Sequence, residues 1–192
     1  MRPSHLAVSL SCVLAFACAT ASPPVVTGPP PDWKMANATM STGNTFEYVG
    51  PSGGQVTVQI SGHDLYGPQF NLSAGGGYVR GTGSGSAVID VTIKGNRAEG
   101  SLKNAPFSCI VETNADGSVH VTGAMGAGNA DYVISQKEIS GRTGAGVISM
   151  VWNPANNRYE GQPTGAHITL PAVMATWSNV EVATVLSVLF NN

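Results

Sequence analysis

The chain has 192 residues, a net charge of −2 and only 10% charged side chains, a length that accommodates one domain with a tail. Valine, isoleucine and threonine number 44, against 19 for leucine, glutamate and lysine together. Because β-branched side chains are stiff and pack well on a pleated surface, this balance favours strands. The composition therefore argues against coiled coils and helical bundles, and the nearly neutral charge offers no basic surface for nucleic acid.

The N-terminus has the pattern of a targeting segment. Arg2 and His5 precede an apolar run of 12 residues at 6–17. A helix of that length is too short to cross about 30 Å of hydrocarbon. It has the size of the hydrophobic region of a secretory signal peptide. We therefore predict an exported protein whose residues 1–21 are a signal peptide.

Two cleavage sites remain open. Residues 19–21 fit the small-x-small pattern of ordinary signal peptidase, which would release a periplasmic or secreted chain beginning at Ser22. Residues 15–18 resemble a bacterial lipobox, in which Cys18 becomes the lipidated first residue and anchors the chain in the outer membrane. The proline-rich residues 22–32 predict an extended tether, which suits a membrane anchor.

Residues 33–192 predict a single β-rich domain. Apolar and polar side chains alternate at 56–60 and at 87–94, the period of a strand with one buried face. The Gly-Asn pair at 95–96 predicts a tight turn into a further strand at 97–102.

Two more hairpins and a short strand follow. The first runs from 107–113 through the turn 114–117 to 118–122, the second from 147–152 through 153–157 to 158–161, and the short strand covers 167–170. Consecutive hairpins form an antiparallel meander, which predicts a sandwich or a barrel.

The C-terminal segment predicts a short α-helix. Ser178 and Glu181 match the S-x-x-E capping box, and apolar side chains recur at helical spacing from Val182 to Phe190. We expect this apolar face to pack on the sheet and Thr184 and Ser187 to lie on the opposite, wet face. The alternative is a final strand, in which Phe190 resembles the terminal aromatic of outer-membrane barrels.

Three glycine- or acid-rich segments predict no complete site. Residues 50–54 match G-x-S-x-G, but a strand rather than a helix follows, so a turn is expected. Glu112, Asn114 and Asp116 resemble the start of a calcium loop, but Glu112 stands where the loop has aspartate and Gly123 where it has a bidentate glutamate. An Asp-Gly hairpin turn explains the same residues. The glycines at 75–85 predict loops, or a strand that another backbone approaches closely.

Single titratable residues are widely spaced. His63, His120 and His167 lie more than 45 positions apart without a zinc-binding pattern, and we expect His120 and His167 on wet strand faces. Cys109 shares a face with apolar neighbours and is expected to be buried and unreactive. We predict no catalytic, cofactor-binding or metal-binding residue, and Cys18 is the one modification candidate.

Three functions remain in view. The first is a non-enzymatic envelope lipoprotein, held at the membrane through Cys18, with a binding or structural role toward a protein or small molecule. The alternative is a carbohydrate- or peptidoglycan-active hydrolase, which would need two carboxylates brought together in space. The scattered candidates for such a pair are Asp64, Asp90, Glu99, Glu112 and Glu160. The third is a small outer-membrane barrel, against which the low aromatic content of 7% weighs.

Overall fold

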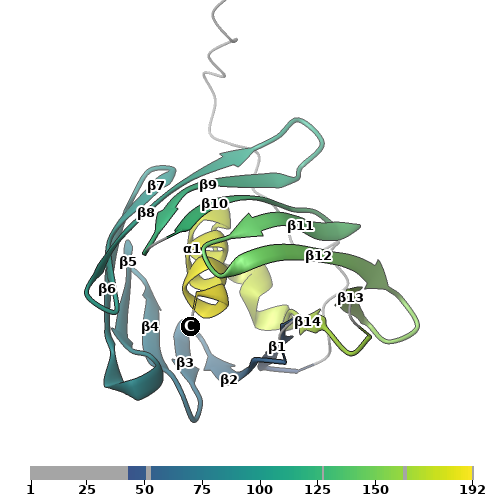
Figure 1. Ribbon diagram of the computed structural model, residues 1–192, viewed down its shortest axis with the longest axis horizontal. Coiled ribbons are helices and arrows are strands. Elements are labelled where there is room, and N and C mark those ends of the chain that lie inside the picture. Colours follow the sequence, from purple (N-terminus) through teal and green to yellow (C-terminus); the bar gives the residue numbers. More distant parts are fainter. Residues whose placement is uncertain (1–42, 51–52, 127, 162–163, 192) are drawn as a thin grey trace, which may run out of the picture.

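The computed structural model describes residues 43–50, 53–126, 128–161 and 164–191. They form a closed barrel of antiparallel strands around a C-terminal helix (Figure 1). The predicted signal peptide, Cys18 and the predicted tether lie outside these residues. The strands are β1 Thr45–Val49, β2 Gln55–Ser61, β3 Asp64–Tyr66, β4 Asn71–Gly75, β5 Tyr78–Thr82, β6 Val88–Lys94, β7 Arg97–Leu102, β8 Ala105–Thr113, β9 Val119–Met125, β10 Gly128–Ile134, β11 Glu138–Thr143, β12 Gly146–Asn153, β13 Arg158–Gly161 and β14 His167–Thr169.

The topology is an up-and-down meander. Each strand pairs with its neighbours in the chain, and β1 pairs with β14 to close the barrel. The predicted antiparallel meander is thus confirmed, in the barrel form. The three predicted hairpins are present as β6–β7, β8–β9 and β12–β13. Gly95 adopts the expected positive φ, 61°, in the two-residue turn of the first hairpin.

Several strands were not predicted, because they are short or interrupted by glycine and polar residues. β5 is one of them and contains Gly81, whose φ is +143°. A Cβ built on Gly81 would lie 2.0 Å from the carbonyl oxygen of Asn71 on β4. In this part of the glycine-rich segment, the prediction of a strand that another backbone approaches closely is therefore confirmed.

The wall of the barrel is apolar inside and polar outside. In β2, Val56, Val58 and Ile60 are buried, whereas Gln55 and Gln59, at alternate positions, are exposed. Charged side chains on neighbouring outer positions form ion pairs, with Arg80 Nε 2.7 Å from Asp90 Oδ1 and Arg97 Nη1 2.8 Å from Glu99 Oε1; the side chains of all four residues are more than half exposed. This distribution is the reverse of that in transmembrane barrels, whose outer band is apolar.

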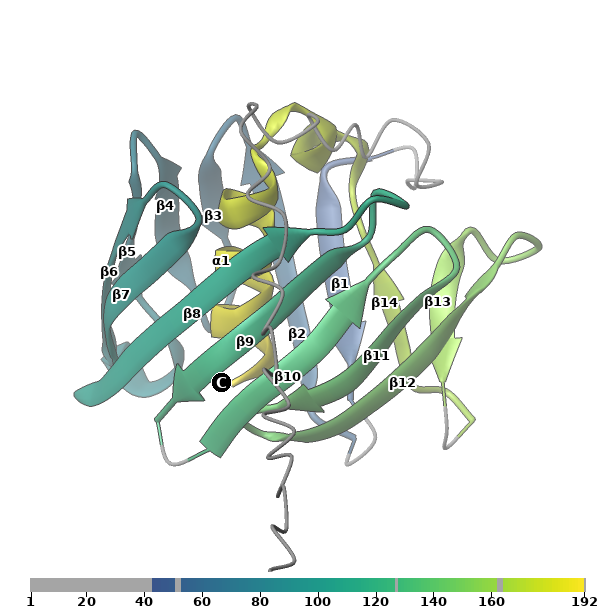
Figure 2. The same cartoon turned by 90° about the horizontal axis from the view of Figure 1, so that it is seen from above.

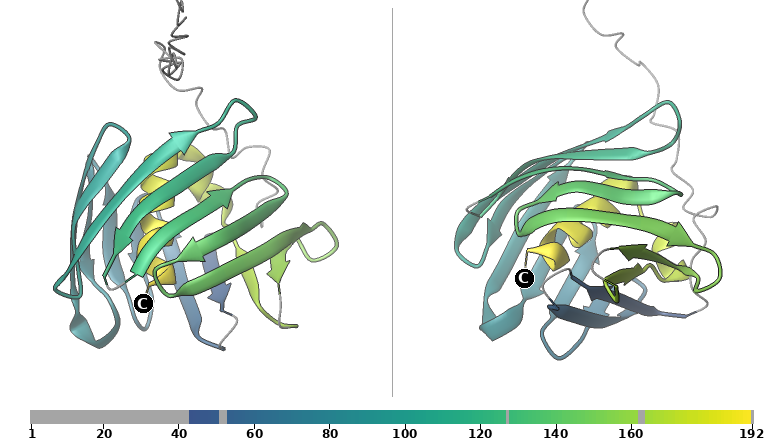
Figure 3. Two further views of the ribbon diagram at one scale, coloured as in Figure 1. Left: turned by 45° about the horizontal axis from the view of Figure 1, so that its top comes forward. Right: turned by 45° about the vertical axis from the view of Figure 1, so that its right-hand side comes forward.

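The C-terminal helix α1, Asn179–Phe190, lies inside the barrel (Figures 2 and 3). The predicted capping box is present, with the Glu181 amide donating to Ser178 Oγ and the Ser178 amide donating to the Glu181 carboxylate. The expectation that Thr184 and Ser187 face water is wrong, because both are fully buried. Strands surround the helix, so residues 182–190 expose no side to solvent.

Hydroxyl groups inside the barrel hold α1 in register. The Ser187 hydroxyl lies 2.7 Å from the Ala183 carbonyl oxygen. The Tyr132 hydroxyl on β10 lies 2.6 Å from Ser187 Oγ and 3.3 Å from the same carbonyl oxygen, so the three groups share hydrogen bonds. Thr184 lies against Cys109 on β8, with Oγ1 4.0 Å from Sγ. The buried polar side chains of the helix are thus matched by partners from the wall, as buried polar groups require.

Aromatic side chains pack at both ends of α1. At its C-terminal end, the ring of Phe190 lies edge-on to Tyr48 on β1 and Tyr132, at centroid distances of 5.0 and 5.9 Å. At the other end, a short 3₁₀ turn, Ala172–Thr176, leads into Trp177. The Trp177 indole donates to the Gly62 carbonyl at 3.1 Å and stacks on His63, so His63 has a packing role.

Candidate functional site

Two hollows open at the surface of the described residues. One cavity of about 390 Å³ opens at the barrel end beside Phe190 and is also lined by Tyr48 and Thr143. A second, of about 560 Å³, lies on the outer face of β12 and β13 and includes Asn156, Arg158 and Glu160. Both volumes fall in the range of small-ligand sites, and the second contains charged side chains.

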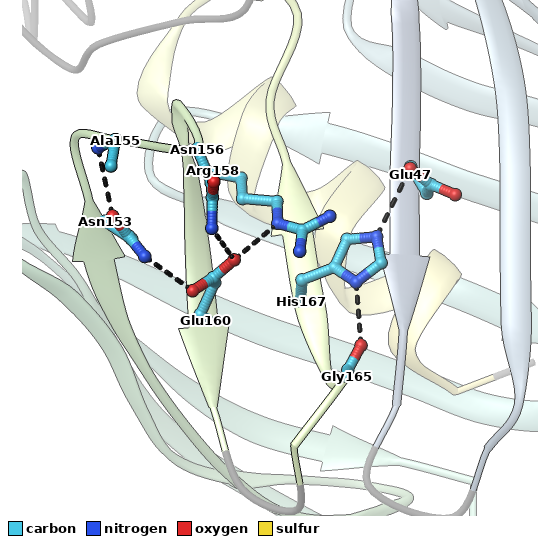
Figure 4. Close-up of polar contacts among 8 residues, drawn as sticks. All are labelled: Glu47, Asn153, Ala155, Asn156, Arg158, Glu160, Gly165 and His167. Atoms are coloured by element: carbon cyan, nitrogen blue, oxygen red, sulfur yellow. Dashed lines mark hydrogen bonds and ion pairs between the residues drawn. The ribbon is translucent and has the colours of Figure 1, made fainter.

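Three charged side chains and a histidine near the second hollow form what we call the seam cluster, which consists of Glu47, Arg158, Glu160 and His167 (Figure 4). They come from β1, β13 and β14, on the outer face where the two ends of the sheet meet. The strand register places His167 between Glu160 on one side and Val49 on the other. Glu47 stands two residues before Val49 on β1 and reaches His167 diagonally.

Glu160 is held by three donors. Asn153 Nδ2 lies 2.6 Å from Oε2, while Asn156 Nδ2 and Arg158 Nε lie 2.8 and 2.7 Å from Oε1. Hydrogen bonds from Asn153, Arg158 and Asn156 lower the pKa of Glu160 to about 2. The hairpin turn supplies two of these donors, so the loop that reverses the chain also fixes this carboxylate in its ionised form.

His167 is largely buried, with only 9% of its surface exposed. The expectation of a solvated histidine is therefore wrong: its position pairs with Glu160 and Val49 on the neighbouring strands, and little of its side chain reaches solvent. Its Nδ1 lies 2.8 Å from the Gly165 carbonyl oxygen, and its Nε2 lies 3.2 Å from Glu47 Oε2. The second contact lacks hydrogen-bond geometry, so Nε2 is a buried polar atom without a hydrogen-bond partner among the described residues.

Glu47 is itself oriented from the neighbouring strand. Gln55 Nε2 on β2 donates to Glu47 Oε1 at 3.2 Å, which leaves Oε2 directed at His167. About one third of the Glu47 side chain is exposed, so the carboxylate forms the solvent side of the pair and the imidazole forms the buried side.

The other predicted candidates are placed elsewhere. His120 lies on the outer face of β9, with Nε2 2.8 Å from Asp131 Oδ1. Asp116 occupies a hairpin turn, where its carboxylate accepts from the Ser118 hydroxyl at 2.6 Å and amide at 2.9 Å, and these bonds lower its pKa. The turn thus accounts for this carboxylate without an ion.

The nucleophile candidates give no site. Cys109 is buried, as predicted, and burial raises the pKa of its thiol to about 11, so the reactive thiolate is strongly disfavoured. Gly50 and Gly54 belong to the β1–β2 connection, with the Gly50 amide donating to the Gly54 carbonyl. This is a strand-to-strand turn, although Ser52 lies outside the described residues.

The carboxylates considered for hydrolysis are dispersed. Asp90 and Glu99 lie on β6 and β7 and are each paired with an arginine. Glu112 lies on β8, and Asp64 begins β3. Of the five, Glu160 alone joins the seam cluster. Within the described ranges, no three His, Cys, Asp or Glu side chains gather as a metal cluster.

Sequence reasoning missed Glu47, Arg158 and the two asparagines. The alternation of Arg158 and Glu160 after an asparagine-rich turn was a usable signal, because both side chains of such a pair share one face of a strand. Nothing local marks Glu47, since its approach to His167 depends on the closure of the barrel.

Comparison of the chain with protein families, curated proteins and solved structures finds no match. In the part of the chain that the structure describes, no helix is long and apolar enough to span a membrane.

Proposed function

We propose that the protein is an exported lipoprotein of the bacterial cell envelope, anchored through Cys18, whose barrel is a non-enzymatic module that binds a partner on its outer surface. The observation that carries the binding role is the position of α1. Many barrels hold a ligand in their interior, but here the protein's own helix takes that space. Recognition therefore falls to the outer face.

The seam cluster and the adjoining hollow are the best-developed part of that face. Three hydrogen bonds hold the Glu160 carboxylate in one orientation. A fixed, ionised carboxylate suits recognition of hydrogen-bond donors. It does not suit the general acid of a glycosidase, which requires a raised pKa. Glu160 is therefore unsuited to the role of general acid, and the hydrolase alternative would need another side chain for that role.

The anchoring part of the proposal is tested by fractionation. The full chain and its Cys18→Ser variant are expressed in a Gram-negative host and partitioned between detergent and aqueous phases. We expect the parent protein in the detergent phase and the variant in the aqueous phase, because the lipid is lost. Equal partitioning of both forms would contradict lipidation and leave cleavage after Ala21.

The non-enzymatic part is tested with a panel of esters, glycosides, peptides and peptidoglycan. We expect no turnover by the purified protein. Turnover that disappears in Glu160→Gln, with the fold retained by circular dichroism, would contradict the binding role and favour the hydrolase.

A further inference from the structure

The wall of the barrel is low where the two ends of the sheet meet. β13 and β14, with four and three residues, lie between β12, with eight, and β1, with five. Met150 on β12 pairs with Gly161, the last residue of β13, so the described part of β13 leaves Gly146–Ser149 of β12 without a partner on that side. The cavity of about 390 Å³ is lined by this end of β12 and by the β1–β2 connection. It thus lies at a gap that the strand lengths create.

Tyr48 provides the aromatic wall of this cavity. Phe190, at the C-terminal end of α1, lies edge-on behind its ring at a centroid distance of 5.0 Å and fixes the orientation of the ring. The Tyr48 hydroxyl lies beside Gly50, where a Cβ would come within 2.8 Å of the hydroxyl oxygen. This hydroxyl has no hydrogen-bond partner within the described ranges, and it is not among the buried unpaired atoms. It is therefore open to solvent and can bond to a ligand.

The other lining groups are apolar or polar without charge. Leu189 provides apolar surface, and Thr143 and Gln55 provide a hydroxyl and an amide. Because Gln55 Nε2 donates to Glu47 Oε1, the amide oxygen of Gln55 remains as an acceptor. None of the described lining residues is Asp, Glu, Lys, Arg or His. A charged ligand would lose water there without meeting an opposite charge, so the lining favours an uncharged one.

We propose that this cavity binds an uncharged saccharide, with a sugar ring against the Tyr48 ring and sugar hydroxyls bonded to the Tyr48 hydroxyl and the Gln55 amide oxygen. A pyranose ring has C–H groups on its faces and hydroxyl groups around its edge. It therefore matches a pocket that combines apolar and aromatic surface with a few polar groups. The cavity is lined by none of the four seam-cluster residues, so this site does not rest on the partner proposed for the outer face.

The test uses the isotope-labelled full chain and follows binding by calorimetry and by amide NMR signals. The uncharged probes are cellobiose, maltose and N,N′-diacetylchitobiose. The charged probe is chitobiose, which has positively charged amino groups where the diacetylated sugar has amides. We expect at least one uncharged probe to bind at millimolar concentration and to shift the signals of Gly54 and Gly146, which line the cavity. Chitobiose should bind more weakly than that probe.

Tyr48→Phe should weaken binding by about three- to tenfold, because the sugar loses one hydrogen bond. It should leave the unfolding temperature unchanged, because the hydroxyl has no partner among the described residues. Tyr66→Phe is the matched control and should bind as the parent does, since Tyr66 is half exposed on β3 and lies outside the cavity.

Four outcomes would overturn the proposal. No uncharged probe binds, or chitobiose binds as tightly as the best of them. Tyr48→Phe binds as the parent does, or no more weakly than Tyr66→Phe. The shifted signals gather at Arg158 and Glu160, which line the other hollow. Tyr48→Phe unfolds at a lower temperature than the parent by as much as its binding is weakened, which would make the role of the hydroxyl structural.

Discussion

At the scale of single residues, the charged side chains of the outer face differ in how many hydrogen bonds hold them. Glu160 has three donors and a pKa lowered to about 2, whereas the side chain of Glu112 on β8 is exposed and makes no hydrogen bond among those that the structure describes. Glu160 should therefore contribute to the dependence of stability on pH.

The prediction for Glu160 concerns the pH dependence of stability. Its folded pKa lies below the ordinary value of about 4.3, so its stabilising effect is complete above about pH 5. The effect is lost as pH falls toward about 2, because the unfolded state takes up the proton first. Glu160→Gln should lower the free energy of unfolding at pH 6 and reduce its fall between pH 6 and pH 2.5, measured by urea denaturation.

Glu112→Gln is the control for that experiment and should leave the pH profile close to that of the parent. A parent-like profile for Glu160→Gln as well would mean that its three hydrogen bonds are not maintained in solution.

At the scale of elements, α1 differs from an ordinary amphipathic helix because it has no wet side. Its N-terminal cap and its extent were predictable, since capping depends on residues three positions apart. Its full burial was not predictable from its own sequence. Thr184 and Ser187 give the segment the polar pattern of a surface helix, but the wall supplies Cys109 and Tyr132 as partners. That pairing depends on residues more than 50 positions away.

The burial of α1 predicts that aspartate is damaging on both of its sides. Thr184→Asp and Leu186→Asp should each lower the free energy of unfolding by about 3–5 kcal/mol or prevent folding, because each buries an unpaired charge. Chemical denaturation followed by tryptophan fluorescence measures the change. Thr82→Asp, at an exposed position of β5, should cost less than about 0.5 kcal/mol. A mild effect of Thr184→Asp would mean that α1 exposes one face.

Substitutions in the wall of the barrel are expected to be most destabilising where the backbones of two strands approach closely. Gly81→Ala should lower the free energy of unfolding by about 2–4 kcal/mol, because its Cβ would collide with the Asn71 carbonyl and its backbone is in a region that alanine avoids. Gly54→Ala is the control, since a Cβ there meets nothing within 4 Å. Equal effects of the two substitutions in urea denaturation would contradict the close approach.

At the scale of the whole molecule, the barrel and α1 complete each other. The strands enclose an apolar interior, and a helix of 12 residues is marginal in water by itself. Among the described residues, each part provides the surface on which the other buries its apolar side chains.

We therefore predict that a chain ending at Trp177 does not form the native barrel. It should lose its near-ultraviolet circular dichroism and bind a hydrophobic dye, because the inner wall loses its packing. Adding a peptide of residues 178–192 should restore the signal. A chain beginning at residue 33 should keep it, since the domain is predicted to start there. A native near-ultraviolet spectrum from the chain ending at Trp177 would contradict this prediction, because it would show that the barrel folds without α1.

The fold was predictable to the level of an antiparallel meander with a final helix, because turns such as Gly95-Asn96 and alternating strands such as 87–94 are local signals. The choice of barrel over sandwich was not, since it rests on the pairing of β1 with β14. The seam cluster has the same origin. Glu160 and its turn are local, whereas the contact between Glu47 and His167 joins residues 120 positions apart, and no periodicity in the sequence reports it.

The position of α1 also fixes an order of assembly. The helix α1 is synthesised after all the described strands, yet it lies inside them in the folded molecule. The first described strand must pair with one that is made more than 100 residues later. While the chain is being made, its emerging hairpins can form locally, but their apolar faces have no helix to cover. Such long-range closure slows folding and leaves those faces open to aggregation in the meantime. A chaperone that shields unfinished hairpins should therefore increase the yield of this protein more than that of a barrel whose central segment is made first.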